Sequence, residues 1–233
     1  MSHAASSLVV LFDIDGTLVT CHGAGRVAIV EAFAEVTGGR EALEGIAFAG
    51  MTDRAIVRAG LATGSWSRGG ADDEALIDEV LARYLMHLPR ALSDKAPRVF
   101  PGAVTLVQHV SGRPDTAVGL GTGNIAAGAK HKLLAAGLWQ RFAFGGFGSD
   151  REDRAALLEV GAQRGAAHLS RPRRETKVVI VGDTPKDVRA AQAIGARCLA
   201  VASPHYPFEA LRDAGADLTV SDLADPDALA FFD

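Results

Sequence analysis

The chain contains 233 residues, which is long for one compact domain and short for two, because domains usually contain about 100–200 residues. Hydrophobic residues make up 48% and charged residues 22% of the chain, as in a folded globular protein and unlike a disordered one. The net charge of −4 argues against the broad basic surface that binds nucleic acids. One core with a modest insert is therefore the organisation we expect.

The first residues predict a cytoplasmic protein that is not anchored in a membrane. Residues 1–7 contain no basic segment, and the apolar run at residues 8–12 is too short for a signal peptide or a membrane span. The two cysteines, Cys21 and Cys198, lack the spacing of a zinc site, so we expect them to be free thiols.

Residues 8–12 form a continuous apolar run, which predicts a strand that is buried on both faces, as in a parallel sheet. After this strand, residues 26–36, 52–61 and 73–92 have helical patterns, with a loop at residues 65–70 and no convincing strand among them. We therefore expect a helical insert that extends over residues 20–97.

From about residue 100 onward, predicted helices and strands alternate. In chain order they are helix 103–110, strand 116–120, helices 125–136 and 154–164, strand 177–181, helix 187–194, strand 197–201, helix 207–214 and a weaker strand at 216–220. This alternation predicts an α/β fold with a doubly wound parallel sheet. The core domain would contain residues 1–19 and 98–233, and the helical insert would form a second domain.

The first chemical motif follows the first strand directly and reads Asp13-Ile14-Asp15-Gly16-Thr17. Asp13 and Asp15 point to the same side of an extended segment, at the strand end where open α/β sheets bind ligands. Two carboxylates this close repel each other, so the pair requires a cation or a shared proton. Gly16 permits a sharp turn, and Thr17 offers a hydroxyl group.

A second motif, Gly182-Asp183-Thr184-Pro185-Lys186-Asp187, ends the strand at 177–181. Asp183 is expected at the same edge of the sheet as Asp13, where a third carboxylate would complete an oxygen-rich site for Mg²⁺. Asp187 has two interpretations, as part of this site or as the N-cap of the following helix.

A third motif, Gly121-Thr122-Gly123-Asn124, follows the strand at 116–120 and precedes a helix. Thr122 supplies a hydroxyl group. The two glycines would let backbone N–H groups approach a phosphate at the helix N-terminus. This segment is therefore a candidate phosphate-binding loop.

Together these residues resemble the haloacid dehalogenase superfamily. Asp13-Ile14-Asp15-Gly16-Thr17 is similar to its first motif, Thr122 to its second, and Gly182-Asp183 with Asp187 to its fourth. The insert resembles the helical cap of the subgroup that includes phosphoglycolate phosphatase and β-phosphoglucomutase. Two segments, Phe48-Ala49-Gly50-Met51-Thr52-Asp53 and Phe100-Pro101-Gly102, are also similar to that subgroup.

The resemblance implies catalytic roles for the two carboxylates of the first motif. Asp13 would be the nucleophile that accepts the phosphoryl group as an aspartyl-phosphate, and Asp15 would be the general acid and base. Thr122, with Gly123 or Asn124, would bind the oxygens of the transferring phosphoryl group.

The resemblance also implies a Mg²⁺ cofactor. The metal ion would be held by a carboxylate oxygen of Asp13, the backbone carbonyl of Asp15, and Asp183. Asp187 would orient metal-bound water or Lys186.

The third motif of the superfamily is where this sequence departs, because the family usually has a lysine there. The chain has five lysines against 19 arginines, and none begins the helix at residues 154–164. Arg154 does begin that helix, so we predict that it substitutes for the lysine in catalysis and substrate binding, with Lys130 as the alternative.

The insert is expected to select the substrate, which would be a small phosphorylated metabolite. Arg26, Arg54 and His22 lie near its hinge or its site-facing segment, and together they suggest an anionic or hydroxylated leaving group. Neither nucleic acid nor membrane is an expected partner. The sequence leaves open whether the protein is a monomer or a small homo-oligomer.

The leading hypothesis is a Mg²⁺-dependent phosphatase for small phosphate monoesters. A phosphomutase of the β-phosphoglucomutase type remains open. A haloacid dehalogenase is disfavoured because it needs neither Asp15 nor a metal ion. A non-catalytic phospho-acceptor module is disfavoured because receiver domains lack a helical insert of about 75 residues.

Overall fold

The computed structural model describes residues 7–64, 66–67 and 69–233. Its core is a six-stranded sheet in which every neighbouring pair of strands is parallel. The strands are β1 (Leu8–Phe12), β4 (Thr116–Thr122), β5 (Gly145–Phe147), β6 (Lys177–Gly182), β7 (Arg197–Val201) and β8 (Leu218–Val220). The predicted doubly wound α/β fold is confirmed.

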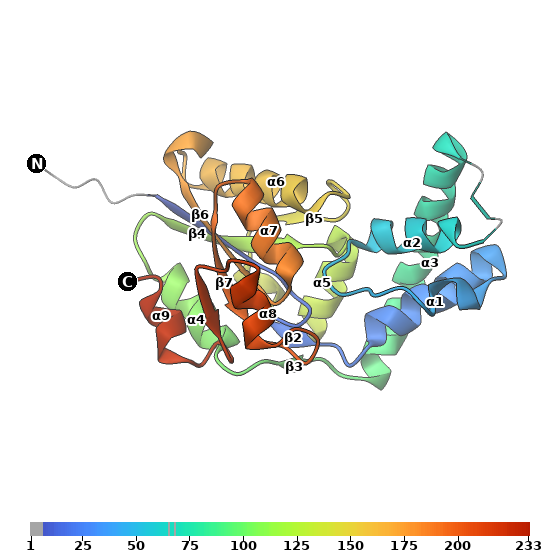
Figure 1. Ribbon diagram of the computed structural model, residues 1–233, viewed down its shortest axis with the longest axis horizontal. Helices are drawn as coiled ribbons and strands as arrows, with labels where there is room; N and C mark the ends of the chain where they lie inside the picture. The colour runs from blue at the N-terminus through green and yellow to red at the C-terminus, as the bar shows by residue number, and fades with distance from the viewer. Residues whose placement is uncertain (1–6, 65, 68) are drawn as a thin grey trace, which may run out of the picture.

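Helices cover both faces of this sheet (Figure 1). Val9 and Leu11 of β1 pack in one buried cluster with side chains of α6, α7 and α8, whereas Val10 and Phe12 belong to the cluster on the opposite face. A strand that is apolar on both faces in this way explains the continuous hydrophobic run at the start of the chain. The core helices are α4 (Ala103–Ser111), α5 (Ala126–Ala135), α6 (Arg154–His168), α7 (Pro185–Ala193), α8 (Phe208–Asp213) and α9 (Pro226–Ala230).

The strand order, β5-β4-β1-β6-β7-β8, places β1 at the centre of the sheet. From β1 the chain first adds strands on one side, through β4 and β5, and then on the other side, through β6, β7 and β8. The carboxyl end of β1 therefore lies at the point where the winding reverses, which is where open α/β sheets bind ligands.

Three helices lie beside the carboxyl end of the sheet, at one end of the molecule (Figure 1). They are α1 (Ala24–Thr37), α2 (Asp53–Ala62) and α3 (Gly70–Asp94), with a 3₁₀ turn, η1 (Arg40–Leu43), between the first two. The helices α1 and α3 pack against each other, and α3 also packs against α5 of the core. Within the described residues, these bounds agree with the three helices predicted between residues 26 and 92.

The segment that contains these helices leaves and re-enters the core at one place. Two short antiparallel strands, β2 (Val19–Thr20) and β3 (Arg98–Val99), pair there to form a separate two-stranded sheet. The sequence did not predict these strands, because two residues are too few to show a period.

Several other elements differ from the prediction. Strand β5 and helix α9 were missed, as were the 3₁₀ turns η2 (Trp139–Arg141) and η3 (Arg173–Glu175). Two of the three residues of β5 are glycines and only Phe147 has a side chain, so the strand shows no hydrophobic pattern. Residues 1–6, 65 and 68 lie outside the described part of the chain, and with them most of the N-terminal segment and part of the predicted loop at 65–70.

Two smaller predictions can also be compared with the structure. Cys21 and Cys198 are both buried free thiols, as expected. In the part of the chain that the structure describes, no helix has both the length and the apolar character that a membrane span requires.

Candidate active site

The predicted chemical motifs meet at the carboxyl edge of the sheet. Asp13 follows β1, Thr122 ends β4, and Asp183 follows β6. All three line a cavity of about 560 Å³ between this edge and the segment with α1, α2 and α3. A volume of this size is typical of sites for small molecules.

Asp13 is held at the floor of this cavity by two hydrogen bonds. The backbone N–H of Ile14 donates to Asp13 Oδ1 at 2.8 Å, and Arg154 Nη2 donates to Asp13 Oδ2 at 2.8 Å. Burial and the charges of Asp187 and Asp15 together raise the pKa of Asp13 to about 6, against the lowering effects of Arg154 and the Ile14 N–H. The Ile14 N–H and Arg154 thus fix the orientation of this carboxyl group from both of its oxygen atoms.

Arg154 is the first residue of α6, as the sequence predicted, and its side chain reaches across to two carboxylates. Besides Asp13, it donates to Asp187 Oδ1 from Nε at 2.8 Å and from Nη2 at 2.5 Å. The guanidinium group is buried, and these two carboxylates hold its pKa above the ordinary value despite the cost of burial. Lys130, the alternative in the prediction, is exposed and does not line the cavity.

Asp187 takes part both in the carboxylate cluster and in the capping of α7, but the prediction that it could be the N-cap was wrong. It is the third residue of α7, where its Oδ2 accepts hydrogen bonds from the backbone and side chain of Thr184 in a capping box. The N-cap is thus Thr184 and not Asp187. The other carboxylate oxygen of Asp187 pairs with Arg154.

Three buried carboxylates, those of Asp13, Asp183 and Asp187, form a possible metal site. One oxygen atom of each lies within 4.8 Å of the others. Burial and the charges of Asp187 and Asp13 hold the pKa of Asp183 well above its usual range. The raised pKa shows that the negative charge of this cluster exceeds what the neighbouring cationic side chain neutralises. Gly16 has φ 86°, and a Cβ there would lie 2.2 Å from Asp183 Oδ2, so a side chain would block the cluster. Such clustered oxygen ligands suit Mg²⁺.

The side chain of Asp15 lies outside this carboxylate cluster and forms a separate network. Asp15 Oδ2 accepts hydrogen bonds from Asn124 Nδ2 at 2.9 Å and from Lys132 Nζ at 2.6 Å. Lys132 also donates to Asn124 Oδ1 at 2.6 Å, which closes a triangle of three side chains. The Asp15 side chain is 45% exposed; partial desolvation raises its pKa, but Lys132 and Asn124 lower it below the ordinary value overall.

Lys132 is a site residue that the prediction missed. It is 4% exposed, and Asp15, Tyr84 and Asp53 keep its pKa well above the usual range despite burial. The sequence does contain a signal for this position. Lys132 lies seven residues after Ile125 and three after Ala129, which is the spacing of one helix face, and both of those residues are buried.

The Gly121–Asn124 loop has the predicted position but a partly different role for its glycines. Asn124 N–H and Nδ2 both donate to Thr122 Oγ1, at 3.3 and 2.8 Å. A Cβ at Gly121 would lie 2.5 Å from Leu158, so this glycine permits close packing inside the core and does not face the cavity. A Cβ at Gly123 would lie 2.3 Å from the carbonyl oxygen of Met51, so Gly123 lets the loop before α2 approach.

Of the three polar residues that were predicted to lie near the substrate, two line the cavity and one does not. Arg26 and His22 line the cavity. The Arg26 guanidinium lies 4.1 Å from the centre of the Phe48 ring and donates to backbone carbonyls of the η1 region, including that of Leu43 at 3.1 Å. Arg54 does not line the cavity, because it pairs with acidic residues of α3, and the prediction for it was wrong.

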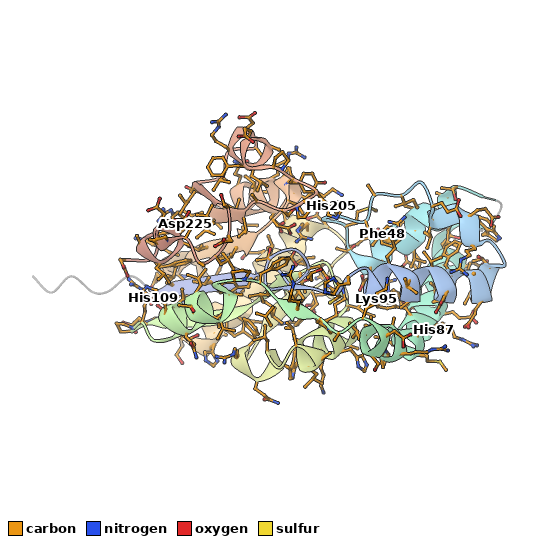
Figure 2. All side chains as sticks on the ribbon, turned by 90° about the horizontal axis from the view of Figure 1, so that it is seen from below. Phe48, His87, Lys95, His109, His205 and Asp225 are labelled. Carbon is orange, nitrogen blue, oxygen red and sulfur yellow. The ribbon has the colours of Figure 1, made fainter. Side chains whose placement is uncertain are left out.

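The cavity is also lined by two residues for which the sequence predicted no individual role. Phe48, from the segment before α2, and His205, from the loop after β7, both line it and lie between the sheet and the three helices (Figure 2). The loop that contains His205 follows a predicted strand, but nothing in its sequence indicates a ligand.

The N-terminus of α2 docks directly on the core. Asp53 N–H donates to the carbonyl oxygen of Gly123 at 2.9 Å, and Asp53 Oδ2 accepts from Ile125 N–H at 2.8 Å. Arg58, one turn later, pairs with Glu152, which precedes Arg154 by two residues. The insert therefore contacts two of the core loops near the site, the one after β4 and the one before Arg154.

This combination of a parallel sheet, an inserted helical segment and clustered aspartates defines a class of hydrolases. The sequence profile of the haloacid dehalogenase-like hydrolase family matches residues 8–195, which is most of the chain. The protein belongs to this family.

Solved structures of the same fold match nearly the whole chain. CbbY from Rhodobacter sphaeroides, in complex with phosphate, has a TM-score of 0.69 at 17% identity, and the match covers 93% of this chain and 95% of CbbY. β-Phosphoglucomutase from Clostridium difficile has a TM-score of 0.66 at 16% identity, covering 97% and 96%. A protein from Haemophilus somnus described as a predicted phosphoglycolate phosphatase has a TM-score of 0.66 at 15% identity, and the match covers 97% of this chain and 99% of that protein. No curated protein matches in sequence.

Proposed function

We propose that the protein is a Mg²⁺-dependent phosphatase that hydrolyses a small phosphate monoester through an aspartyl-phosphate on Asp13. One observation carries this proposal. The Asp13 carboxylate lies beside Asp183 and Asp187 and is paired with Arg154 at 2.8 Å, at the winding reversal of the sheet. A buried nucleophile, a fixed cation and an oxygen-rich metal site are the parts that phosphoryl transfer needs.

In the first step, a carboxylate oxygen of Asp13 attacks the phosphorus atom, and the bond from phosphorus to the ester oxygen breaks. Arg154 offsets negative charge on the Asp13 carboxylate and the phosphoryl group as they approach. Thr122, Gly123 and Asn124 bind the phosphoryl oxygens. Asp15 gives a proton to the leaving oxygen, since the bound phosphate dianion raises the pKa that Lys132 otherwise lowers.

In the second step, a water molecule attacks the phosphorus of the aspartyl-phosphate, and Asp15 accepts the proton of that water. The bond between phosphorus and Asp13 breaks, and inorganic phosphate leaves. Each step uses Asp15 in the opposite protonation state, so the residue is ready for the next ester after one turnover.

Asp13, Asp183 and the backbone carbonyl of Asp15 would hold the Mg²⁺ ion, with Asp187 beside them. When bound, Mg²⁺ supplies positive charge that lets the anionic carboxylate and phosphoryl groups approach each other. The clustered carboxylate oxygens and the space left by Gly16 support this part of the proposal.

The proposal includes the organisation of the chain and its partners. Residues 1–19 and 98–233 would form the catalytic core, and residues 20–97 a cap that selects the substrate. The substrate would be a small phosphorylated metabolite of the cytoplasm, with no nucleic-acid or membrane partner. The protein would be a monomer or a small homo-oligomer.

The experiment is a measurement of inorganic phosphate release from a panel of phosphate monoesters, with added Mg²⁺ and with a chelator. We expect Mg²⁺-dependent release, and we expect Asp13→Asn to lose at least about 10³-fold in kcat, because a carboxamide is a poor nucleophile. Release that continues with the chelator, or full activity of Asp13→Asn, would contradict the proposal. Transfer of phosphate to a sugar without phosphate release would indicate a phosphomutase instead.

A further inference from the structure

The hydroxyl group of Tyr84 is in an unusual environment. Tyr84 lies on α3 and is 1% exposed, yet its hydroxyl has no hydrogen-bond partner among the described residues. A buried hydroxyl group without a partner destabilises a protein, and phenylalanine would fill the same space without this cost. The hydroxyl therefore calls for an explanation other than packing.

The position of this hydroxyl group connects it to the cavity. Tyr84 and Lys132 both line the cavity, together with Gly25 of α1. A Cβ at Gly25 would lie 3.2 Å from Lys132 Nζ and 3.9 Å from the Tyr84 hydroxyl oxygen. A Cβ at Gly128 would lie 3.2 Å from the same oxygen. A side chain at Gly128 would thus press on the Tyr84 hydroxyl, and one at Gly25 would press on the Lys132 ammonium group.

Lys132 has hydrogen-bonding capacity in the same place. Its ammonium group has three donors, and the contacts with Asp15 and Asn124 use two of them. Lys132 bonds to Asp15, the proposed general acid, so the space beside Lys132 and Tyr84 would lie near the ester oxygen of a substrate bound as proposed above. Both groups can bond to an oxygen atom on the leaving alcohol.

The charges around this space indicate which kind of oxygen would fit. Asp15 at 2.6 Å offsets the charge of Lys132, and Asp53 in the same cavity wall adds a further carboxyl group. A carboxylate bound beside Lys132 would add negative charge next to Asp15 and Asp53, where the charge of Lys132 is already paired. A neutral hydroxyl group would satisfy both Tyr84 and Lys132 without that cost.

We propose that Tyr84 and Lys132 form a subsite for a hydroxyl group carried by the leaving alcohol, close to the ester oxygen. The substrates would then be phosphate esters of polyols or sugars. This subsite rests on the phosphatase function proposed above, since it defines the leaving group of that reaction.

The test compares two esters that share one carbon skeleton, glycerol 2-phosphate and isopropyl phosphate, which lacks both hydroxyl groups. We expect the wild-type enzyme to have the higher kcat/KM with glycerol 2-phosphate. Tyr84→Phe should lower the ratio of the two kcat/KM values by about tenfold, the effect of one lost hydrogen bond to the substrate. Similar kcat/KM values for the two esters, or an unchanged ratio in the variant, would overturn the subsite.

Thr219→Val is the matched control. Thr219 in β8 has a buried hydroxyl without a partner among the described residues, but it does not line the cavity. Both variants should keep or raise Tm, whereas only Tyr84→Phe should change the ratio. A Tyr84→Phe variant with a lower Tm and an equal loss on both esters would show a structural role and contradict the subsite.

Two further probes separate the possible failures. If acetyl phosphate and both esters release no phosphate with Mg²⁺ present, the phosphatase proposal itself fails. If Tyr84→Phe loses activity on phosphoglycolate but not on glycerol 2-phosphate, the subsite binds a carboxylate, and the assignment to a hydroxyl group is wrong.

Discussion

Arg154 is the one buried side-chain cation that contacts both Asp13 and Asp187 in the described part of the chain. A buried charge is costly unless it is paired, and here the two carboxylates and the guanidinium group each depend on the others. The residue therefore contributes to stability as well as to the proposed chemistry, and the two contributions can be separated by pH.

Replacing Arg154 with alanine should destabilise the protein by about 3 kcal/mol at pH 8, because two buried carboxylates lose their partner. The folded-state pKa of Asp13, about 6 against an ordinary 3.8, would rise further without the cation. A carboxyl pKa raised on folding costs stability as the pH rises from the unfolded value to the folded one, so wild type and variant differ most above pH 6, and the loss should shrink as the pH falls from 8 to about 6. Thermal unfolding from pH 4 to 8 measures this.

The control for this prediction is Arg151→Ala, because Arg151 is exposed and donates only to the backbone of Asp150 in the described contacts. It should change neither stability nor phosphate release. An Arg154→Ala variant with the same pH profile as the wild type would show that the pair with Asp13 is not a significant source of stability.

At the residue scale, the sequence predicted the carboxylates and Arg154 because each follows a strand or begins a helix. It failed for Lys132 and Arg54, whose roles depend on the face of a helix they occupy. A helix turns by about 100° per residue, so Lys130 and Lys132 lie on nearly opposite sides of α5, and only packing decides which side is buried.

The N-terminus of α2 shows how one element joins the insert to the site. Thr52 caps the helix by accepting a hydrogen bond from Ala55 N–H, and Asp53 bonds the core at Gly123 and Ile125. Burial raises the pKa of Asp53 to about 6, against the lowering effects of Lys132 and the Ile125 N–H. The charged form of Asp53 is thus costly at neutral pH.

Asp53→Asn should therefore stabilise the protein by about 1–2 kcal/mol at pH 8, because asparagine keeps an acceptor for Ile125 N–H without the charge. The gain is reduced because a negative charge in the first turn of a helix is favourable by up to about 1 kcal/mol. Near pH 4 the folded-state carboxyl group is already protonated, so the gain should disappear. Urea unfolding at pH 8 and at pH 4 measures the stability gain at each pH. A gain of equal size at the two pH values would contradict the raised pKa of Asp53.

At the element scale, the sequence predicted the long helices and the buried strands, because each repeats its pattern over several residues. It failed for β5, in which Gly146 fits closely against the backbone of α6 and Gly145 against Leu120 of β4 and the Phe147 ring. A Cβ at Gly146 would lie 1.9 Å from the carbonyl oxygen of Leu157. There is no room for side chains at the two glycines, so only Phe147 of this strand is hydrophobic and no pattern can be recognised.

Over the whole molecule, a set of charged side chains connects the insert to the core. Arg58 of α2 pairs with Glu152 of the core through both of its carboxylate oxygens, and it also pairs with Glu74 of α3. These groups are partly exposed, so the pairs contribute little to folding. They do set how closely the loop before Arg154 and the N-terminus of α2 approach each other.

Arg58→Met should lower kcat/KM by up to about fivefold at low salt, because the insert would then be held less firmly over the site. The effect should shrink at about 1 M salt, since exposed charges are screened there in the wild type as well. Arg83→Met, an exposed position on α3, is the control and should leave kcat/KM unchanged at both salt concentrations. A loss for Arg58→Met that does not depend on salt would indicate a packing role instead.

The pairing of β2 with β3 has a consequence for how such proteins diversify. The segment between Thr20 and Arg98 begins and ends on residues that are hydrogen-bonded neighbours. The entropy cost of closing a loop grows only with the logarithm of its length, so the length of the segment inserted there has little effect on the stability of the sheet. Insertions, deletions or a wholly different insert could be exchanged at this junction during evolution, while the catalytic carboxylates keep their positions.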